Sequence, residues 1–440
     1  MRTDIQERQK ITGEIQIPSA LVEEVTTGLK NIAQLQEKLK AAETQGVSKF
    51  FSILLISALP LDASDIHIEP EGEVTKIRLR IDGILQDIID VSRDTYEALL
   101  SRVKLVSGIK LNVTSKPQDG RFSFVLPAGE LIEVRTATLP AEYGEAIVLR
   151  ILNPKGLVGL KDLGLRQDLL SVLEQELKKP NGMILATGPT GCGKTTTLYA
   201  FLKQIAKPEI KIVTIEDPIE YHLEGISQTQ INPEKGYDFA SGLQAIVRQD
   251  PDVILVGEIR DATTAQISLQ AALTGHLVFS TLHTNDAAGT ISRLMSLEAK
   301  PLNIAAASNV IIGQRLVRKV CAQCALFTKI TEIELGKIRK GLEGIKASLP
   351  TKILPGLKIA RVKGCKECNN TGYKGRIGIF EAILVDPEME EYILTVPTTS
   401  SLLQFAVKRG MVTMYQDGLL KVANRITTFE EIERVTGIYS

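Results

Sequence analysis

The 440-residue sequence predicts an α/β domain that is preceded by a smaller α+β domain and followed by a mostly helical region. A chain of this length normally folds as two or three domains rather than around one core. In its middle, longer helical segments separate short, mostly apolar runs at Met183–Ala186, Lys211–Ile215, Val253–Val256 and Leu277–Ser280. Strands of this kind are typical of a sheet that helices cover on both faces.

The first 152 residues follow a different pattern, in which apolar and polar residues alternate as in strands with one buried face. The first 45 or so residues are expected to be helical and loosely attached. Asp82-Gly83 offers the positive φ angles of a tight hairpin turn. We expect helices at about 48–59 and 93–106, and strands at 66–68, 75–81, 84–88, 121–126, 131–136 and 146–151.

These patterns divide the chain into six segments. Asn153-Pro154-Lys155-Gly156 marks the main boundary, and from about Pro301 the chain is expected to be mostly helical. The predicted segments are a helical extension (1–47), the α+β domain (48–152), a linker (153–165), the α/β core (166–315), a cysteine-containing module (316–380) and a C-terminal helical region (381–440).

The composition excludes some classes of protein. Lys plus Arg and Asp plus Glu number 52 each, so no global charge bias favours direct binding of nucleic acid or of an anionic membrane. The charged N-terminus lacks the apolar core of a signal peptide. Phe50–Leu61, the longest apolar stretch, is much shorter than the about 20 residues that span a bilayer. We therefore expect a cytoplasmic protein whose membrane contact is peripheral.

A phosphate-binding loop follows the first apolar run. The segment from Gly188 to Thr195 fits GxxxxGK[ST], and it lies between a predicted strand and a predicted helix. Glycines let the backbone wrap phosphates, and the helix N-terminus presents free amide donors. Lys194 is expected to reach the β/γ-phosphate oxygens, and the Thr195 hydroxyl to help hold Mg²⁺. The nucleotide-binding residues are thus Gly188, Pro189, Thr190, Gly191, Cys192, Gly193, Lys194, Thr195 and Thr196.

Acidic residues at two strand ends predict hydrolysis. Glu258 follows the buried run Val253–Val256, and Glu216 and Asp217 follow the run before it. Hydrolysis of ATP needs an oriented water and a held Mg²⁺, and carboxylates do both. We assign Glu258 to the water and the Mg²⁺ shell, with Glu216 and Asp217 assisting. The alternative is that these acids merely occupy loops after strands.

Three further side chains belong to the same region. His276 and His283 flank the run Leu277–Ser280, and we interpret them as sensors of the γ-phosphate or of an interface. The alternative is that both are structural. Cys192 is interpreted as a small residue that fits the loop rather than as a redox group. The helix N-terminus can lower the pKa of the thiol, and we predict that bulky thiol reagents inhibit the protein and that ATP protects it.

Together these segments resemble the secretion ATPases of type II secretion and type IV pilus assembly. The resemblance extends from about Phe50 to the C-terminus. The segments that carry it are Val247–Asp261, which contains RQDPD and GEIRD; Ile215–Glu220, like an aspartate box; Gly275–His283, like a histidine box; and Asp65–Pro70 and Gln118–Arg121, like parts of the family's N-terminal domain.

The resemblance implies a P-loop (RecA-like) ATPase domain and a homo-hexamer that works with an inner-membrane platform protein. It also implies that nucleotide binds between the N-terminal and ATPase domains of one subunit. By motif position, Arg121 and Arg135 would reach the phosphates from the N-terminal domain, and Arg150 is a weaker candidate. Such arginines stabilise charge on the γ-phosphoryl group. The alternative is that they are strand arginines facing solvent.

Four of the five cysteines form two CxxC pairs, Cys321/Cys324 and Cys365/Cys368. Each pair can hold one side of a tetrahedral Zn²⁺, so the four predict a closed structural zinc site. The competing interpretation is reactive or redox cysteines. The sequence around the second pair resembles the tetracysteine module of assembly and secretion ATPases, which retraction ATPases typically lack.

Other functions stay open at this point. The main alternative is a traffic ATPase of DNA uptake or conjugation, in which the CxxC pairs form a nucleic-acid-binding ribbon. Balanced charge argues against direct nucleic-acid binding. A scaffold that binds nucleotide without turnover is disfavoured by Lys194 and Glu258. Only about 45 residues precede the resemblance, so the family's N-terminal adaptor domain is expected to be missing.

Overall fold

The computed structural model describes residues 13–153, 158–345 and 356–437, and these form two compact units. The first unit contains the described residues up to Asn153 together with the segment Lys363–Lys374. The second contains the described residues of 158–362, that is 158–345 and 356–362, together with 375–437. The predicted boundary at Pro154–Gly156 lies outside the described residues.

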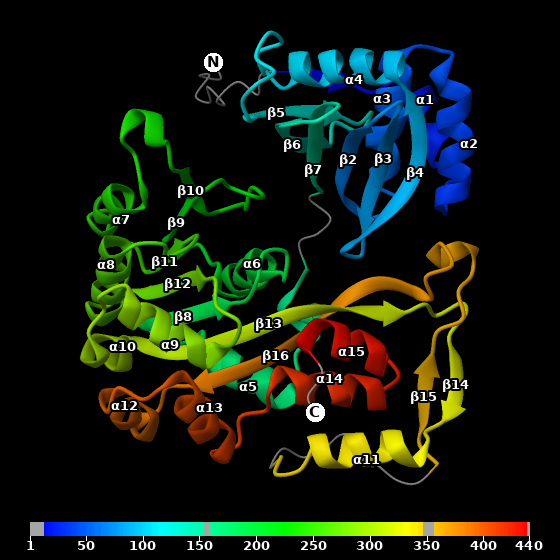
Figure 1. Ribbon diagram of the computed structural model, residues 1–440. Helices are drawn as coiled ribbons and strands as arrows, with labels where there is room; N and C mark the ends of the chain where they lie inside the picture. Colours follow the sequence, from blue (N-terminus) through cyan, green and yellow to red (C-terminus); the bar gives the residue numbers. More distant parts are fainter. Residues whose placement is uncertain (1–12, 154–157, 346–355, 438–440) are drawn as a thin grey trace. The chain divides into compact units, whose positions relative to one another are not determined.

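The first unit is built on a seven-stranded sheet with the order β1-β5-β6-β7-β2-β3-β4 (Figure 1). Its strands are β1 (Glu14–Gln16), β2 (Ala63–Glu71), β3 (Val74–Ile81), β4 (Ile84–Ser92), β5 (Gln118–Val125), β6 (Leu131–Ala141) and β7 (Gly144–Leu152). All neighbours are antiparallel except β1 and β5, which are parallel. Asp82 and Gly83 have the positive φ angles of the hairpin turn between β3 and β4, as the sequence predicts.

Four helices complete this unit: α1 (Ser19–Thr26), α2 (Ile32–Glu43), α3 (Val47–Ala58) and α4 (Arg93–Val106). Helix α3 is buried along nearly its whole length because its sequence is apolar on all sides. Helices α3 and α4 contact each other and the sheet. The Ser92 hydroxyl caps α4 by accepting a hydrogen bond from the amide of Thr95. Helices and sheet share one apolar core.

The N-terminal extension is part of this core. Leu35 and Leu39 of α2 are fully buried in it, and so is Val25 of α1. Strand β1 extends the sheet by pairing with β5. The expectation of loose attachment is therefore wrong for residues 13–45, because the apolar stripe that made them look helical is what packs them onto the domain.

The second unit contains a seven-stranded sheet with the order β10-β9-β11-β12-β8-β13-β16. Its strands are β8 (Gly182–Thr187), β9 (Ile212–Glu216), β10 (Ser227–Gln230), β11 (Val253–Val256), β12 (Leu277–Leu282), β13 (Ser308–Val320) and β16 (Tyr373–Leu384). Pairing is parallel from β10 through β13.

Helices cover both faces of this sheet, as its apolar strands predict. The helices of the α/β part are α5 (Gln167–Glu176), α6 (Lys194–Ile205), α7 (Phe239–Val247), α8 (Ala262–Leu273), α9 (Ala287–Ser296) and α10 (Pro301–Ala307). Residues of α7 to α10 belong to one apolar core, and residues of α5 and α6 belong to another. The two cores take side chains from alternating positions of the same strands.

The chain after Pro301 is less helical than expected. The expected helices are present as α11 (Glu332–Gly341), α12 (Pro387–Leu394), α13 (Thr399–Lys408), α14 (Met414–Ala423) and α15 (Phe429–Thr436). Strands β13 and β16 were not expected, nor was the small sheet of β14 (Leu326–Lys329) and β15 (Lys358–Arg361). The apolar start of β13 (VIIG) lacks the alternation that marks a strand with one exposed face, because the strand lies inside the sheet.

None of the helices in the described ranges is both long enough and apolar enough to cross a bilayer.

Because Leu39 of α2 is buried in the core of the first unit, we expect its side chain to stabilise that unit. Replacing Leu39 by Ala removes a fully buried side chain and should lower the free energy of unfolding by about 2–5 kcal/mol. Lys40→Ala, at the exposed neighbouring position, should change it by less than about 0.5 kcal/mol. Urea titration followed by circular dichroism measures both. Equal midpoints for the two variants would show that the extension does not stabilise the domain.

Candidate functional site

The phosphate-binding loop leaves the carboxyl end of β8 and leads into α6. Every residue of β8 is buried, and the strand lies between β12 and β13. Gly188, Gly191 and Gly193 all have positive φ angles. At Gly188 a Cβ atom would stand 2.5 Å from both the Cys192 Sγ and the Gln314 carbonyl oxygen. Only glycine therefore fits there. Pro189, Thr190 and Gly191 are exposed at the tip of the loop.

Lys194 begins α6, and its ammonium group points back into the loop. It donates hydrogen bonds to the carbonyl oxygens of Gly188 (2.7 Å) and Pro189 (3.2 Å). Burial lowers the pKa of this ammonium, while the nearby Cys192 and Glu258 oppose the shift. Thr195 and Thr196, the other predicted ligands on α6, are half-buried.

Cys192 is enclosed rather than reactive. Its side chain is buried, and burial raises the pKa of its thiol. A raised pKa disfavours the nucleophilic thiolate. These observations favour the interpretation of Cys192 as a small residue that fits the loop, and they argue against sensitivity to thiol reagents.

Three of the predicted residues meet through ion pairs at the ends of three neighbouring strands. Glu258, after β11, pairs with the Arg260 guanidinium and with His283 Nε2, at 3.2 Å. Arg260 also pairs with Asp217, after β9, at 3.5 Å. His283 follows β12 directly. The structure thus gathers Asp217, Glu258 and His283 around one arginine that was not among the predicted site residues.

Glu216 lies apart from this group. It ends β9 with its side chain buried, and it accepts hydrogen bonds from the Tyr199 hydroxyl, from Thr214 Oγ1 (2.5 Å) and from Gln228 Nε2 (3.2 Å). Burial raises the pKa of this carboxyl group. The contacts describe a side chain that joins α6 to β9 and β10, rather than one that assists Glu258.

His276 also lies apart, because it precedes β12 whereas His283 follows it. A strand of six residues separates them by about 20 Å. The His276 ring lies 3.0 Å from the Ala271 carbonyl oxygen, through Nδ1, at the opposite edge of the sheet from the phosphate loop. The prediction that His276 senses the γ-phosphate within its own subunit does not fit this placement; the interface role stays a prediction.

Sequence reasoning missed Gln314 and Arg315, which lie on β13 where it passes the phosphate loop. Gln314 Nε2 donates to the Cys192 carbonyl oxygen at 2.8 Å, and Arg315 Nη2 donates to the Asn285 carbonyl oxygen at 2.8 Å. Two polar residues after an apolar run are a weak sequence signal for a functional site. We expected the chain after Pro301 to be helical, so the sequence did not place Gln314 and Arg315 on a strand beside the phosphate loop.

The first unit carries its own candidate feature, a row of arginines across the sheet. In register, Arg121 on β5 lies opposite Arg135 on β6, which lies opposite Arg150 on β7. Asp65 on β2 continues the row and accepts ion pairs from Arg150 (2.9 Å) and Arg80 (3.3 Å). The register thus brings three arginines side by side across β5, β6 and β7, with Asp65 and Arg80 at one end of the row. The predicted Arg121 and Arg135 are therefore neighbours on one sheet, and Arg80 is an addition to them.

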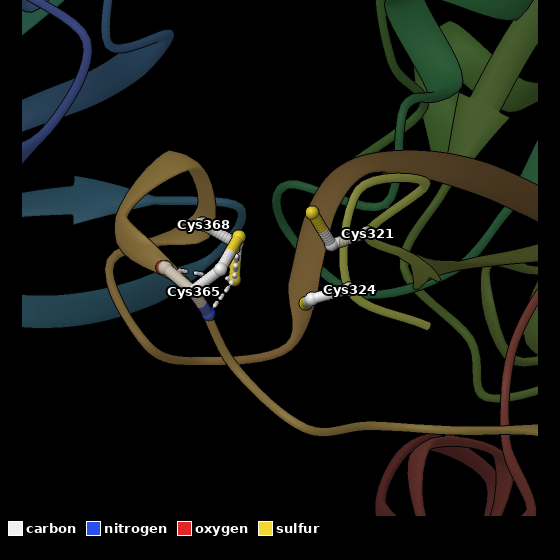
Figure 2. A group of neighbouring side chains, drawn as sticks. All are labelled: Cys321, Cys324, Cys365 and Cys368. Atoms are coloured by element: carbon white, nitrogen blue, oxygen red, sulfur yellow. Dashed lines mark hydrogen bonds between the residues drawn. The ribbon is translucent and has the colours of Figure 1, made fainter. Parts of the chain in front are cut away.

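The four predicted zinc ligands form a cluster (Figure 2). The sulfur atoms of Cys321, Cys324, Cys365 and Cys368 all lie within 4.8 Å of one another, and none is in a disulfide. Tetrahedral zinc with four thiolates places its sulfurs about 3.8 Å apart, so the cluster needs only a small contraction. The Cys368 sulfur also accepts hydrogen bonds from the amides of Cys365 and Gly372, at 3.2 Å each, which stabilise a thiolate. The donor set thus fits Zn²⁺.

Comparisons with known proteins agree with this geometry. A family model described as type II/IV secretion system protein matches residues 40–434. Type II secretion system protein E of Aeromonas hydrophila is 40% identical over 408 residues, which are 92% of this chain and 79% of that protein. Type IV pilus assembly ATPase PilB of Thermus thermophilus is 40% identical over 391 residues, which are 89% of this chain and 43% of that protein.

Solved structures support the fold. The pilus retraction motor PilT, solved with bound ADP, is 27% identical with a TM-score of 0.57, and the match covers 87% of this chain and 95% of that chain. The ATPase DotB of Legionella pneumophila has a TM-score of 0.62 at 22% identity, covering 88% of this chain and 94% of that chain. The similarity to DotB supports the fold alone.

The cysteine cluster predicts that the purified protein contains zinc. Protein purified with zinc present should retain about one Zn²⁺ per chain by plasma mass spectrometry. Cys365→Ser should lose most of it and should melt at a lower temperature. Cys192→Ser, which changes the one cysteine outside the cluster, should keep it. A zinc-free wild type, or equal zinc in both variants, would contradict the assignment.

Proposed function

This chain belongs to the type II/IV secretion system protein family, and from that premise we infer that it is an ATPase whose hydrolysis drives assembly of a type IV pilus or a type II secretion pseudopilus. The observation that supports catalysis most directly is the position of Glu258. Its carboxylate stands at a strand end beside the phosphate loop, close enough to Lys194 to influence the pKa of that ammonium. Arg260 and His283 hold it there.

In the proposed reaction the loop amides and Lys194 bind the phosphates of ATP. The Lys194 ammonium exchanges its hydrogen bonds with the carbonyls of Gly188 and Pro189 for bonds with phosphate oxygens. Glu258 orients the attacking water, and His283 fixes the carboxylate through the oxygen that Arg260 does not contact. Mg²⁺, which Thr195 would help to hold, supplies charge neutralisation at the phosphates.

We further propose that the arginine row of the first unit stabilises negative charge on the nucleotide. Three arginines placed side by side by the register of β5, β6 and β7 suit a polyanionic ligand. Arg121 and Arg135 remain the leading candidates. Arg150 and Arg80 pair with Asp65, and these ion pairs hold one end of the row in place.

The assembly is proposed from the family. We propose a homo-hexamer at the cytoplasmic face of the inner membrane, where a platform protein receives the mechanical work and provides the membrane association. The tetracysteine cluster supports assembly rather than retraction. A basic and aromatic surface for nucleic acid was not among the predicted features, so we expect a platform protein, rather than DNA, to stimulate hydrolysis.

Steady-state ATPase activity tests the proposal. The wild type should hydrolyse ATP only with Mg²⁺, and Glu258→Gln should lower kcat by about 100-fold or more while still binding nucleotide. Glu224→Gln, an identical change at an exposed position, should leave kcat within about twofold of wild type. A Glu258→Gln enzyme with normal kcat would remove Glu258 from the mechanism. Stimulation by DNA but not by a platform protein would favour a nucleic-acid traffic ATPase instead.

A further inference from the structure

Gln314 and Arg315 connect two loops that the proposed mechanism treats separately. Parallel pairing places Gly313 of β13 opposite Thr187, the last residue of β8. The next two residues of β13 therefore run alongside the phosphate loop. Gln314 is fully buried and donates to the Cys192 carbonyl oxygen of that loop. Arg315 donates to the carbonyl oxygen of Asn285, two residues after His283.

The loop that carries His283 is otherwise held through short polar contacts. The Thr284 amide donates to the Thr187 hydroxyl at 3.0 Å, and the two hydroxyl oxygens lie 2.6 Å apart. These bonds fix the start of the loop at the end of β8. Arg315 contacts the loop one residue later, so its removal would release the side of the loop that faces β13.

The Arg315 guanidinium also lies close to the phosphate loop itself. A Cβ atom at Gly188 would stand 3.2 Å from Arg315 Nη1. The charge of Arg315 contributes to lowering the pKa of Lys194, and it opposes the burial that raises the pKa of the Cys192 thiol. One guanidinium thus reaches both loops, because it is flat, holds its donors in a fixed arrangement and stays charged at all working pH values.

We propose that Arg315 is a positioning residue for hydrolysis: with Gln314 it sets the spacing between the phosphate loop and the loop that carries His283, and thereby aims Glu258 at the attacking water. This inference rests on the proposed ATPase activity. It assigns to β13 a role in the reaction itself, beyond its place in the sheet. Small displacements of a catalytic group cost up to about 100-fold in rate, so the spacing matters even though Arg315 need not touch the reacting atoms.

The first test compares Arg315→Gln with Lys319→Gln, which removes a positive charge from an exposed position of the same strand. Arg315→Gln should lower kcat by about 10- to 100-fold, with the Kd for a fluorescent ATP analogue raised less than about fivefold. Arg315→Lys should recover part of kcat, because an ammonium can still donate to the Asn285 carbonyl. Lys319→Gln should behave as wild type. The proposal is overturned if kcat is unchanged in Arg315→Gln, or if activity falls only because the variant binds nucleotide more weakly, with a higher Kd.

A double-mutant cycle tests the route through His283. If Arg315 acts by placing that histidine, His283→Gln and Arg315→Gln should each lower kcat, and the double variant should lose little more than the worse single variant. The proposal is overturned if the two reductions in kcat multiply in the double variant, or if the His283→Gln enzyme is fully active. Should Arg315→Gln fail to fold, the cycle is run with Arg315→Lys.

The experiments distinguish a failure of the proposed ATPase function from a failure of the positioning role of Arg315. A wild type without turnover, or a Glu258→Gln variant with normal turnover, contradicts the proposed function. A normal wild type and an inactive Glu258→Gln variant, combined with a fully active Arg315→Gln variant, contradict only the positioning role.

Discussion

Parallel pairing within the second sheet is the constraint on which the site depends. Strands β9, β11, β12, β8 and β13 all run the same way, so the residues that follow them meet at one edge. The phosphate loop, Asp217, Glu258 and His283 reach that edge from four different strands. The phosphate loop starts from β8, a strand that is buried along its whole length and paired on both sides.

Glu216 and Glu258 lie at the ends of the neighbouring strands β9 and β11, but their surroundings differ. Glu216 is surrounded by a tyrosine, a threonine and a glutamine, and burial raises the pKa of its carboxyl group. Glu258 is instead paired with a guanidinium and an imidazole. The first arrangement suits a carboxyl group that stabilises packing, whereas the second fixes the Glu258 side chain between two basic side chains. Burial lowers the pKa of Lys194, and the nearby Cys192 and Glu258 oppose that shift.

Two buried carboxylates, Glu381 of β16 and Asp417 of α14, tie the C-terminal helices to the rest of the unit. Glu381 accepts hydrogen bonds from the amide of Ala287, at the start of α9, and from the amide of Met414, at the start of α14. Asp417 of α14 accepts from the amide of Phe380 and pairs with Lys421 at 2.7 Å. Both carboxylates are paired, as burial requires. The helices therefore pack as part of the unit rather than as an appended region.

The sequence by itself determined the elements and chemistry that depend on neighbouring residues. The phosphate loop needs glycines and a lysine at fixed spacing, each CxxC pair holds two ligands locally, and Glu258 follows its strand directly. The resemblance to secretion ATPases followed from several such segments in order. The tertiary structure alone decided which distant residues meet. It placed Arg260 between Asp217 and Glu258, and it enclosed Glu216. It also made β13 a central strand, which sequence periodicity could not show because a strand buried on both faces has no alternation.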